Sequence, residues 1–135
     1  MNEEPPAAAV ESHVIVTRLD DEAATAVCEL ARSLGLDCAR IDLEGCWEKG
    51  DVLARIASAL QFPAWFGQNW DALFDCLTDL SWRPARGYVL VLEHAGELRD
   101  SSPEVYDTAL GILGEAAAAW QVRGVPLRVL VSAGA

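Results

Sequence analysis

Three aspartates at regular spacing are the side chains of this sequence best suited to chemistry. Asp71, Asp75 and Asp79 stand at positions i, i+4 and i+8, so they share one face if the segment is helical. Like charges at this spacing cost roughly 0.2–0.5 kcal/mol per pair, and residues 62–82 contain no lysine or arginine to offset them. A face built only for stability would mix both signs, so the row indicates a surface for a cationic partner. An ordinary solvated polar face is the alternative.

The residues between the aspartates predict that the row lies on the outside of a helix. Asn69 can cap this helix, which is expected to run to about Leu80. On a helical wheel an apolar core stripe forms from four residues, Leu73, Cys76, Leu77 and Leu80. Almost opposite this stripe lie Asp71, Asp75 and Thr78, with Phe74 and Asp79 beside them.

Aromatic residues surround the same helix. Trp65 and Phe66 precede it, and Trp70 and Phe74 lie on it. Aromatic side chains are enriched in protein interfaces, so Trp65 and Phe74 are expected to contact a partner. Trp70 is expected to pack in the core instead.

The remaining elements predict an α/β domain. Strands are expected at 13–17, 38–43, 88–92 and 125–131, and helices at 23–34, 49–60 and 102–119. The first strand, helix and strand form a βαβ unit, so these two strands are expected to pair in parallel. The fold class is therefore a mostly parallel sheet of three to four strands with helices packed on it. Residues 1–12 are expected to be a flexible leader before a single domain of residues 13–135.

The charge balance limits the partners that the protein can bind. Its 21 acidic and 10 basic residues give a net charge of −11, which repels nucleic acid and anionic membranes and attracts basic proteins. No apolar run reaches the length of a membrane span, and the first residues lack the features of a signal peptide. We therefore predict a cytoplasmic protein that binds neither nucleic acid nor membrane.

The cysteines and histidines do not form a metal-binding motif. The sequence has no CxxC pair, and His13 and His94 stand far apart, so zinc-site spacing is absent. No metal or cofactor is predicted. Four cysteines, each in an apolar neighbourhood, are expected to be free, buried residues in a reducing compartment: Cys28, Cys38, Cys46 and Cys76.

Residues 63–78 carry a resemblance to a known family. They read Pro-Ala-Trp-Phe-Gly-Gln-Asn-Trp-Asp-Ala-Leu-Phe-Asp-Cys-Leu-Thr, a pattern that resembles the barstar family of intracellular ribonuclease inhibitors. A weaker similarity extends over residues 38–132. The resemblance implies a barstar-like core at 38–132, preceded by an extra strand and helix at 13–37, in a protein that is not an enzyme.

The resemblance also implies roles for the loop and helix, which block the active site of a basic, secreted ribonuclease in this family. Asp75 would be the main anchor in a phosphate subsite, and Asp71 would pair with a basic residue at its edge. Trp65 would lie against the catalytic histidine, and Phe74 and Thr78 would fill the space around these contacts.

Further positions belong to the implied contact surface. Gly67 and Asn69 are part of the matched motif, and Glu115 is the best match to a glutamate of the penultimate helix that also contacts the nuclease. The sequence departs from the family at Asp79 and Leu80, where a glycine and an aromatic residue are usual. The cognate enzyme of this protein is therefore not fixed by the resemblance.

Two other functions are compatible with the sequence. Asp71 and Asp75 could form a carboxylate pair for acid–base or metal chemistry, although there is no nucleophile–His–Asp set, phosphate-binding glycine loop or metal motif. The chain could also be an immunity or regulatory protein for a different basic toxin. The sequence does not predict an oligomeric state, although an exposed edge strand offers a dimer contact.

Overall fold

The computed structural model describes residues 13–133. In chain order its elements are β1 (Val14–Thr17), α2 (Asp21–Ser33), β2 (Asp37–Asp42), α3 (Lys49–Leu60), α4 (Trp70–Asp79), β3 (Tyr88–Glu93), α5 (Gly96–Ser101), α6 (Pro103–Val122) and β4 (Leu127–Ser132). The leader predicted at residues 1–12 lies outside the described residues.

The four strands form one parallel sheet with the order β1-β4-β3-β2, which confirms the predicted α/β class. The predicted pairing of the first two strands is wrong, because β1 and β2 occupy opposite edges. β1 pairs with β4, and β2 pairs with β3. All six residues of β3 are buried, whereas three of the four residues of β1 are exposed. The apolar strand therefore takes a central position and the exposed strand an edge.

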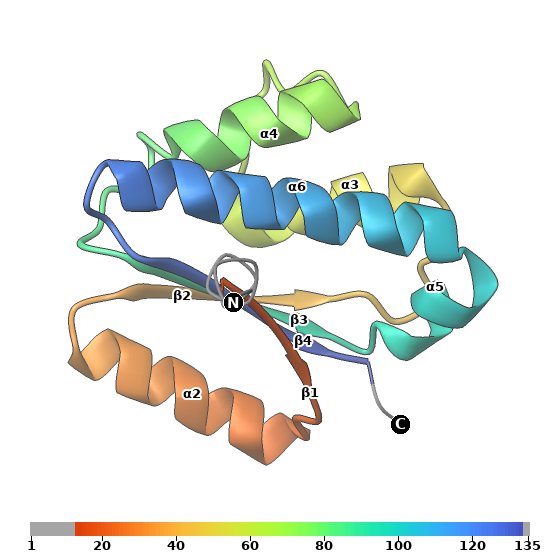
Figure 1. The fold of residues 1–135 in the computed structure, drawn as a ribbon, viewed down its shortest axis with the longest axis horizontal. Coiled ribbons are helices and arrows are strands. Elements are labelled where there is room, and N and C mark those ends of the chain that lie inside the picture. Colours follow the sequence, from red (N-terminus) through yellow and green to blue (C-terminus); the bar gives the residue numbers. More distant parts are fainter. Residues whose placement is uncertain (1–12, 134–135) are drawn as a thin grey trace, which may run out of the picture.

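Helices cover both faces of this sheet (Figure 1). α3 and α6 lie on one face, and α4 packs against α6 as the outermost helix. α2 lies on the opposite face. Strand β3 contributes to both cores, with Tyr88, Leu90 and Leu92 under α3 and α6, and Val89 and Val91 under α2.

Local signals set most helix boundaries as predicted. The Asp20 carboxylate accepts a hydrogen bond from the Ala23 N–H at 2.7 Å and caps α2, and Gly35 follows this helix with φ +81°. Pro103 is the first residue of α6, where its missing N–H is not needed. The sequence did not predict α5, because six residues carry too little apolar periodicity.

The prediction of four free cysteines is wrong for two of them. Cys28 of α2 and Cys38 of β2 are buried and form a disulfide, while Cys46 and Cys76 are free and buried as predicted. The bond removes the basis on which the cysteines indicated a reducing compartment. No helix within residues 13–133 is long and apolar enough to cross a membrane.

A second link between α2 and the sheet is made by Arg40 of β2. Its guanidinium donates two hydrogen bonds to the Glu93 carboxylate at 2.6 and 2.7 Å. It also donates to the Thr25 hydroxyl at 2.8 Å and to the Asp21 carboxylate at 2.7 Å. The Glu93 side chain is only 10% exposed, so the guanidinium supplies the counter-charge that a carboxylate with little access to water needs.

Reduction of the Cys28–Cys38 disulfide should lower the free energy of unfolding. A cross-link restricts the unfolded chain, and its loss is expected to cost roughly 2–4 kcal/mol, measured by urea unfolding with and without reductant. The double variant Cys28→Ala, Cys38→Ala should be less stable than the oxidised protein and should not respond to reductant. Equal stability of the oxidised and reduced wild type would contradict the prediction.

Substitution of Arg40 should destabilise the protein, because it leaves a buried carboxylate without a counter-charge. Arg40→Ala is expected to lower the free energy of unfolding by about 3 kcal/mol, because Glu93 loses its counter-charge. Asp21 is 91% exposed, so Asp21→Asn should cost less than about 1 kcal/mol. Urea unfolding of the two variants side by side checks this order, and equal losses would be evidence against it.

Candidate partner-binding surface

The ends of α4 are fixed by backbone and cap geometry. The Asn69 side-chain oxygen accepts a hydrogen bond from the Ala72 N–H at 2.7 Å, and Leu80 ends the helix in the left-handed conformation with φ 48°. The predicted core stripe is confirmed, since four of its residues are buried: Leu73, Cys76, Leu77 and Leu80. α4 therefore presents its opposite side to solvent.

Cys76 lies on the core side of this helix and is not a nucleophile for the surface. Burial raises the pKa of its thiol, and the charges of Asp79 and Asp75 raise it further. The thiol is therefore protonated at neutral pH and behaves as a small apolar side chain.

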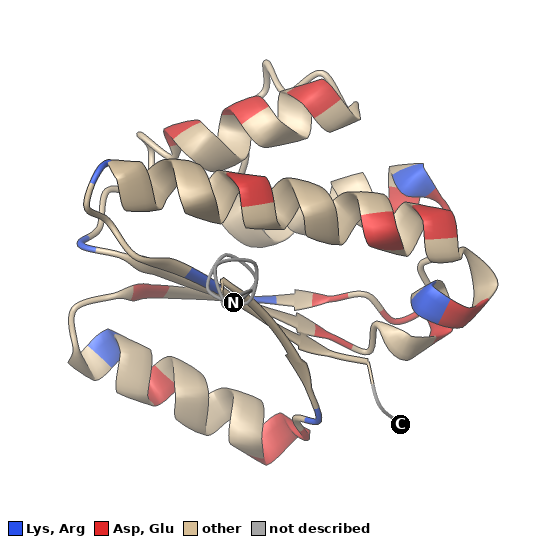
Figure 2. Ribbon diagram, in the orientation of Figure 1, with Lys and Arg blue, Asp and Glu red and all other residues tan. Residues whose placement is uncertain are grey.

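The acid row, defined as Asp71, Asp75 and Asp79, lies on the exposed side of α4. None of the three carboxylates forms an ion pair with another residue of the described range 13–133. Figure 2 shows acidic residues and no basic residue along this helix. The row is thus a set of like charges at the outer surface of the molecule.

Trp120 of α6 and Arg123, the residue that caps this helix, hold the C-terminal end of α4. The Trp120 indole N–H donates to the Leu77 carbonyl at 2.8 Å, and the Arg123 guanidinium donates to the Thr78 carbonyl at 2.7 Å. The guanidinium also stacks on the Trp120 ring at 4.4 Å. These carbonyls belong to the last turn, where a helix leaves its acceptors unpaired.

Sequence reasoning missed both anchors, because they stand more than 40 residues after the carbonyls that they bind. It also treated the acid row as free of nearby cations, which holds only for residues 62–82. The fold brings Arg123 to the end of α4, where it binds the carbonyl of Thr78, the residue before Asp79. A basic residue at a helix end is a known partner of helix carbonyls, but the sequence did not indicate which helix it would serve.

An aromatic cluster supports the loop that precedes α4. Phe62 contacts Phe66 and Trp82 edge to face, with ring centroids 4.9 and 5.9 Å apart. Trp82 donates its indole N–H to the Leu60 carbonyl at 2.9 Å and meets Trp65 edge to face at 6.3 Å. Trp65 is 60% exposed, so it is a large apolar side chain held at the surface by its neighbours.

The other aromatic predictions have mixed outcomes. Trp70 is half-buried against the core, as predicted, but Phe74 is also half-buried and packs against the same core. Phe74 therefore exposes only part of its ring beside the acid row. Thr78 is half-buried too, and its hydroxyl donates to the Phe74 carbonyl at 2.9 Å.

Three further predicted contact residues are exposed, namely Gly67, Asn69 and Glu115. They differ in their hydrogen bonds. The Asn69 amide donates to the Gly67 carbonyl at 3.4 Å and also caps the helix, so both ends of its side chain serve the loop and the helix. Glu115 lies on α6, and no hydrogen bond or ion pair holds its side chain within residues 13–133.

The acid row does not form a metal-ligand group within the described part of the chain. Potential ligand atoms that lie within 4.8 Å of one another are found there for Asp42, Glu44 and His94, none of which is on α4. The interpretation of Asp71 and Asp75 as a metal or acid–base pair thus gains no support from the geometry.

Comparison with known proteins identifies the family. The family model described as Barstar (barnase inhibitor) matches residues 36–132, which is most of the chain, so the chain belongs to the barstar family. No curated protein matches the sequence. The family is one of inhibitors rather than enzymes. The match begins after β1 and α2.

The cap geometry predicts that Asn69 acts by positioning α4. Asn69→Ala should lower the free energy of unfolding by about 1 kcal/mol, because the Ala72 N–H loses its acceptor. Asn69→Asp should retain most of the stability, since aspartate caps helices equally well. Urea unfolding distinguishes the two variants. Equal losses for alanine and aspartate would show that the cap is not the source of the effect.

Proposed function

We propose that the protein inhibits a basic ribonuclease of the barnase type by placing α4 and the preceding loop in the enzyme's active site. The single observation that carries this proposal is the acid row, which is exposed and makes no ion pair with residues 13–133. Membership of an inhibitor family supports the choice of partner.

The acid row matches the chemistry of a ribonuclease site. Such a site binds RNA phosphates with cationic side chains, and carboxylates on a rigid helix can take the place of those phosphates. Asp75 occupies the middle of the row, with Asp71 about 6 Å before it along the helix axis. In the proposed complex Asp75 enters the phosphate subsite and Asp71 pairs with a cation at its edge.

The loop residues complete the proposed contact surface. Trp65 has most of its ring available to a partner, and the aromatic contacts with Trp82 hold it in place before binding. A surface that is ordered in advance loses less conformational entropy on association. The partly exposed Phe74 and Thr78 would pack around the anchors, and Gly67 would allow close approach of the backbone.

Electrostatic attraction should also speed the encounter. The chain carries a net charge of −11, and the opposite charge of a basic enzyme would steer the two proteins together. Glu115 adds one more exposed carboxylate on α6. An inhibitor of this kind would act in the cytoplasm of the cell that makes the enzyme, where the Cys28–Cys38 disulfide would meet reductants.

One observation favours a second candidate, an immunity protein for a different basic toxin. Asp79 replaces the glycine that is usual in the family and adds an exposed charge at the end of the acid row. Leu80 replaces an aromatic residue and is fully buried, so it offers no contact to a partner. Of the two changes, only Asp79 falls within the proposed contact surface, where its charge would alter the choice of enzyme.

Inhibition of a barnase-type ribonuclease by wild type and Asp75→Asn tests the proposal. We expect wild type to inhibit RNA cleavage, with a potency that falls as salt screens the attraction, and Asp75→Asn to lose most of that potency. Removal of a like charge should leave stability unchanged or slightly higher, so unfolding cannot explain the loss.

Glu29→Gln provides the matched control. It removes one exposed negative charge from α2, on the opposite face of the sheet from α4, and should inhibit as well as wild type. Equal potency of Asp75→Asn and wild type would exclude the proposed role of Asp75. Wild type that fails to inhibit would favour the second candidate.

A further inference from the structure

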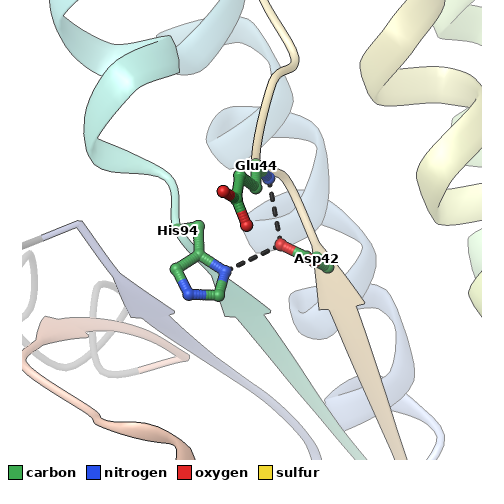
Figure 3. Close-up of side chains that lie close together, drawn as sticks. All are labelled: Asp42, Glu44 and His94. Atoms are coloured by element: carbon green, nitrogen blue, oxygen red, sulfur yellow. Dashed lines mark hydrogen bonds and ion pairs between the residues drawn. The ribbon is translucent and has the colours of Figure 1, made fainter.

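Three potential metal ligands meet at the carboxyl ends of two neighbouring strands (Figure 3). Asp42 is the last residue of β2, Glu44 lies two residues further on, and His94 directly follows β3. One donor atom from each side chain lies within 4.8 Å of the other two. Because β2 and β3 are parallel neighbours, their pairing brings together residues that stand about 50 positions apart in the sequence.

Backbone contacts hold the three residues in place. Arg55 of α3 donates to the Asp42 carbonyl at 2.6 Å and to the Glu44 carbonyl at 2.9 Å. The Asp42 carboxylate accepts hydrogen bonds from the Glu44 N–H at 3.0 Å and lies 2.7 Å from His94 Nδ1. His94 has φ 59°, so the backbone changes direction directly after β3. Together these contacts fix the backbone positions from which the three side chains extend.

The Asp42–His94 contact also shows that the two side chains are electrostatically coupled. The hydrogen bond with the Asp42 carboxylate raises the pKa of His94. The pKa of Asp42 is lowered mainly by the hydrogen bond from the Glu44 N–H and to a smaller extent by His94. Their side chains are 58% and 57% exposed, so both groups are open to an ion from solvent and free to adjust.

The surroundings leave room for an ion and its waters. Glu44 and His94 line one hollow of about 310 Å³ together with Glu97 and Arg99. His94 also lines a second hollow of about 530 Å³, with Ser132 at the end of β4 on its wall. Proteins with parallel sheets commonly bind ligands outside the carboxyl ends of their strands, and His94 lies there between the two hollows.

We propose that Asp42, Glu44 and His94 form a surface binding site for a divalent transition-metal ion of the Zn²⁺ type. An imidazole nitrogen with two carboxylate oxygens is a ligand set that suits Zn²⁺, whereas Mg²⁺ and Ca²⁺ prefer oxygen ligands alone. Tetrahedral bonds of 2.0–2.1 Å require donor atoms about 3.3 Å apart. The Asp42–His94 contact therefore has to open by roughly half an ångström, which exposed side chains can do.

This site shares no residue with α4 or its loop, so it is independent of the proposed inhibition. A bound ion would join the loop after β2 to the residue after β3. Because the ion would bind the folded chain and not the unfolded one, it should raise the melting temperature, and the rise should grow with the logarithm of the ion's concentration above its dissociation constant.

Calorimetric titration of the tag-free, full-length protein with ZnCl₂ tests the site. We expect one ion per chain and a rise in melting temperature, with no comparable response to MgCl₂. His94→Asn should weaken Zn²⁺ binding by at least about tenfold, and asparagine tolerates the left-handed backbone at this position. Asp42→Asn and Glu44→Gln should also weaken binding.

The controls separate this site from the other acids and from the thiols. Asp71→Asn with Asp75→Asn, on α4, and Glu97→Gln, in the neighbouring hollow, should bind Zn²⁺ as wild type does. The absorption spectrum of the Co²⁺ form should lack thiolate charge-transfer bands, because Cys46 is buried and is not a ligand. Absence of Zn²⁺ binding at about 1 mM, or unchanged binding by His94→Asn, or thiolate bands, would overturn the proposal.

Discussion

A central parallel strand that is buried on both faces requires a layer of helix on each side of the sheet. Every residue of β3 is buried, and a parallel sheet cannot leave such a strand open to water. α3 and α6 cover one face, and α2 covers the other (Figure 1). The second layer is thin, since its core contains mainly small side chains. It is secured by a disulfide and by the hydrogen bonds of Arg40 to Thr25 and Asp21 of α2.

The position of α4 follows from this arrangement. α6 lies on the sheet, and α4 packs on α6 as the outermost helix, so only one stripe of α4 is needed for the core. Burial of a leucine side chain contributes about 1.5–3 kcal/mol, and Leu73 and Leu77 are both fully buried. Repulsion within the acid row costs only a few tenths of a kcal/mol per pair. The scaffold can therefore hold a like-charged face for binding without losing the helix.

Two carboxylates at the ends of paired strands differ in burial and therefore in role. Asp42 and Glu93 are opposite each other in the β2–β3 register. Glu93 is buried and pairs with Arg40 of the neighbouring strand. The same guanidinium also binds Thr25 and Asp21 of α2 and so ties this helix to the sheet. Asp42 is exposed and contacts a histidine that is itself exposed. A carboxylate thus stabilises the fold at the end of β3, whereas the carboxylate at the end of β2 remains open to solvent.

The sequence by itself determined the class of fold, most element boundaries and the face of α4 that carries the acid row. These features depend on residues within one turn or one strand of each other, such as the Asn69 cap and the apolar stripe of α4. The tertiary structure alone decided which strands pair, that Cys28 meets Cys38, that Trp120 and Arg123 hold the end of α4, and that His94 lies beside Asp42. Those contacts join residues that are separated along the chain, and only the packing of the sheet and its helices brings them within bonding distance.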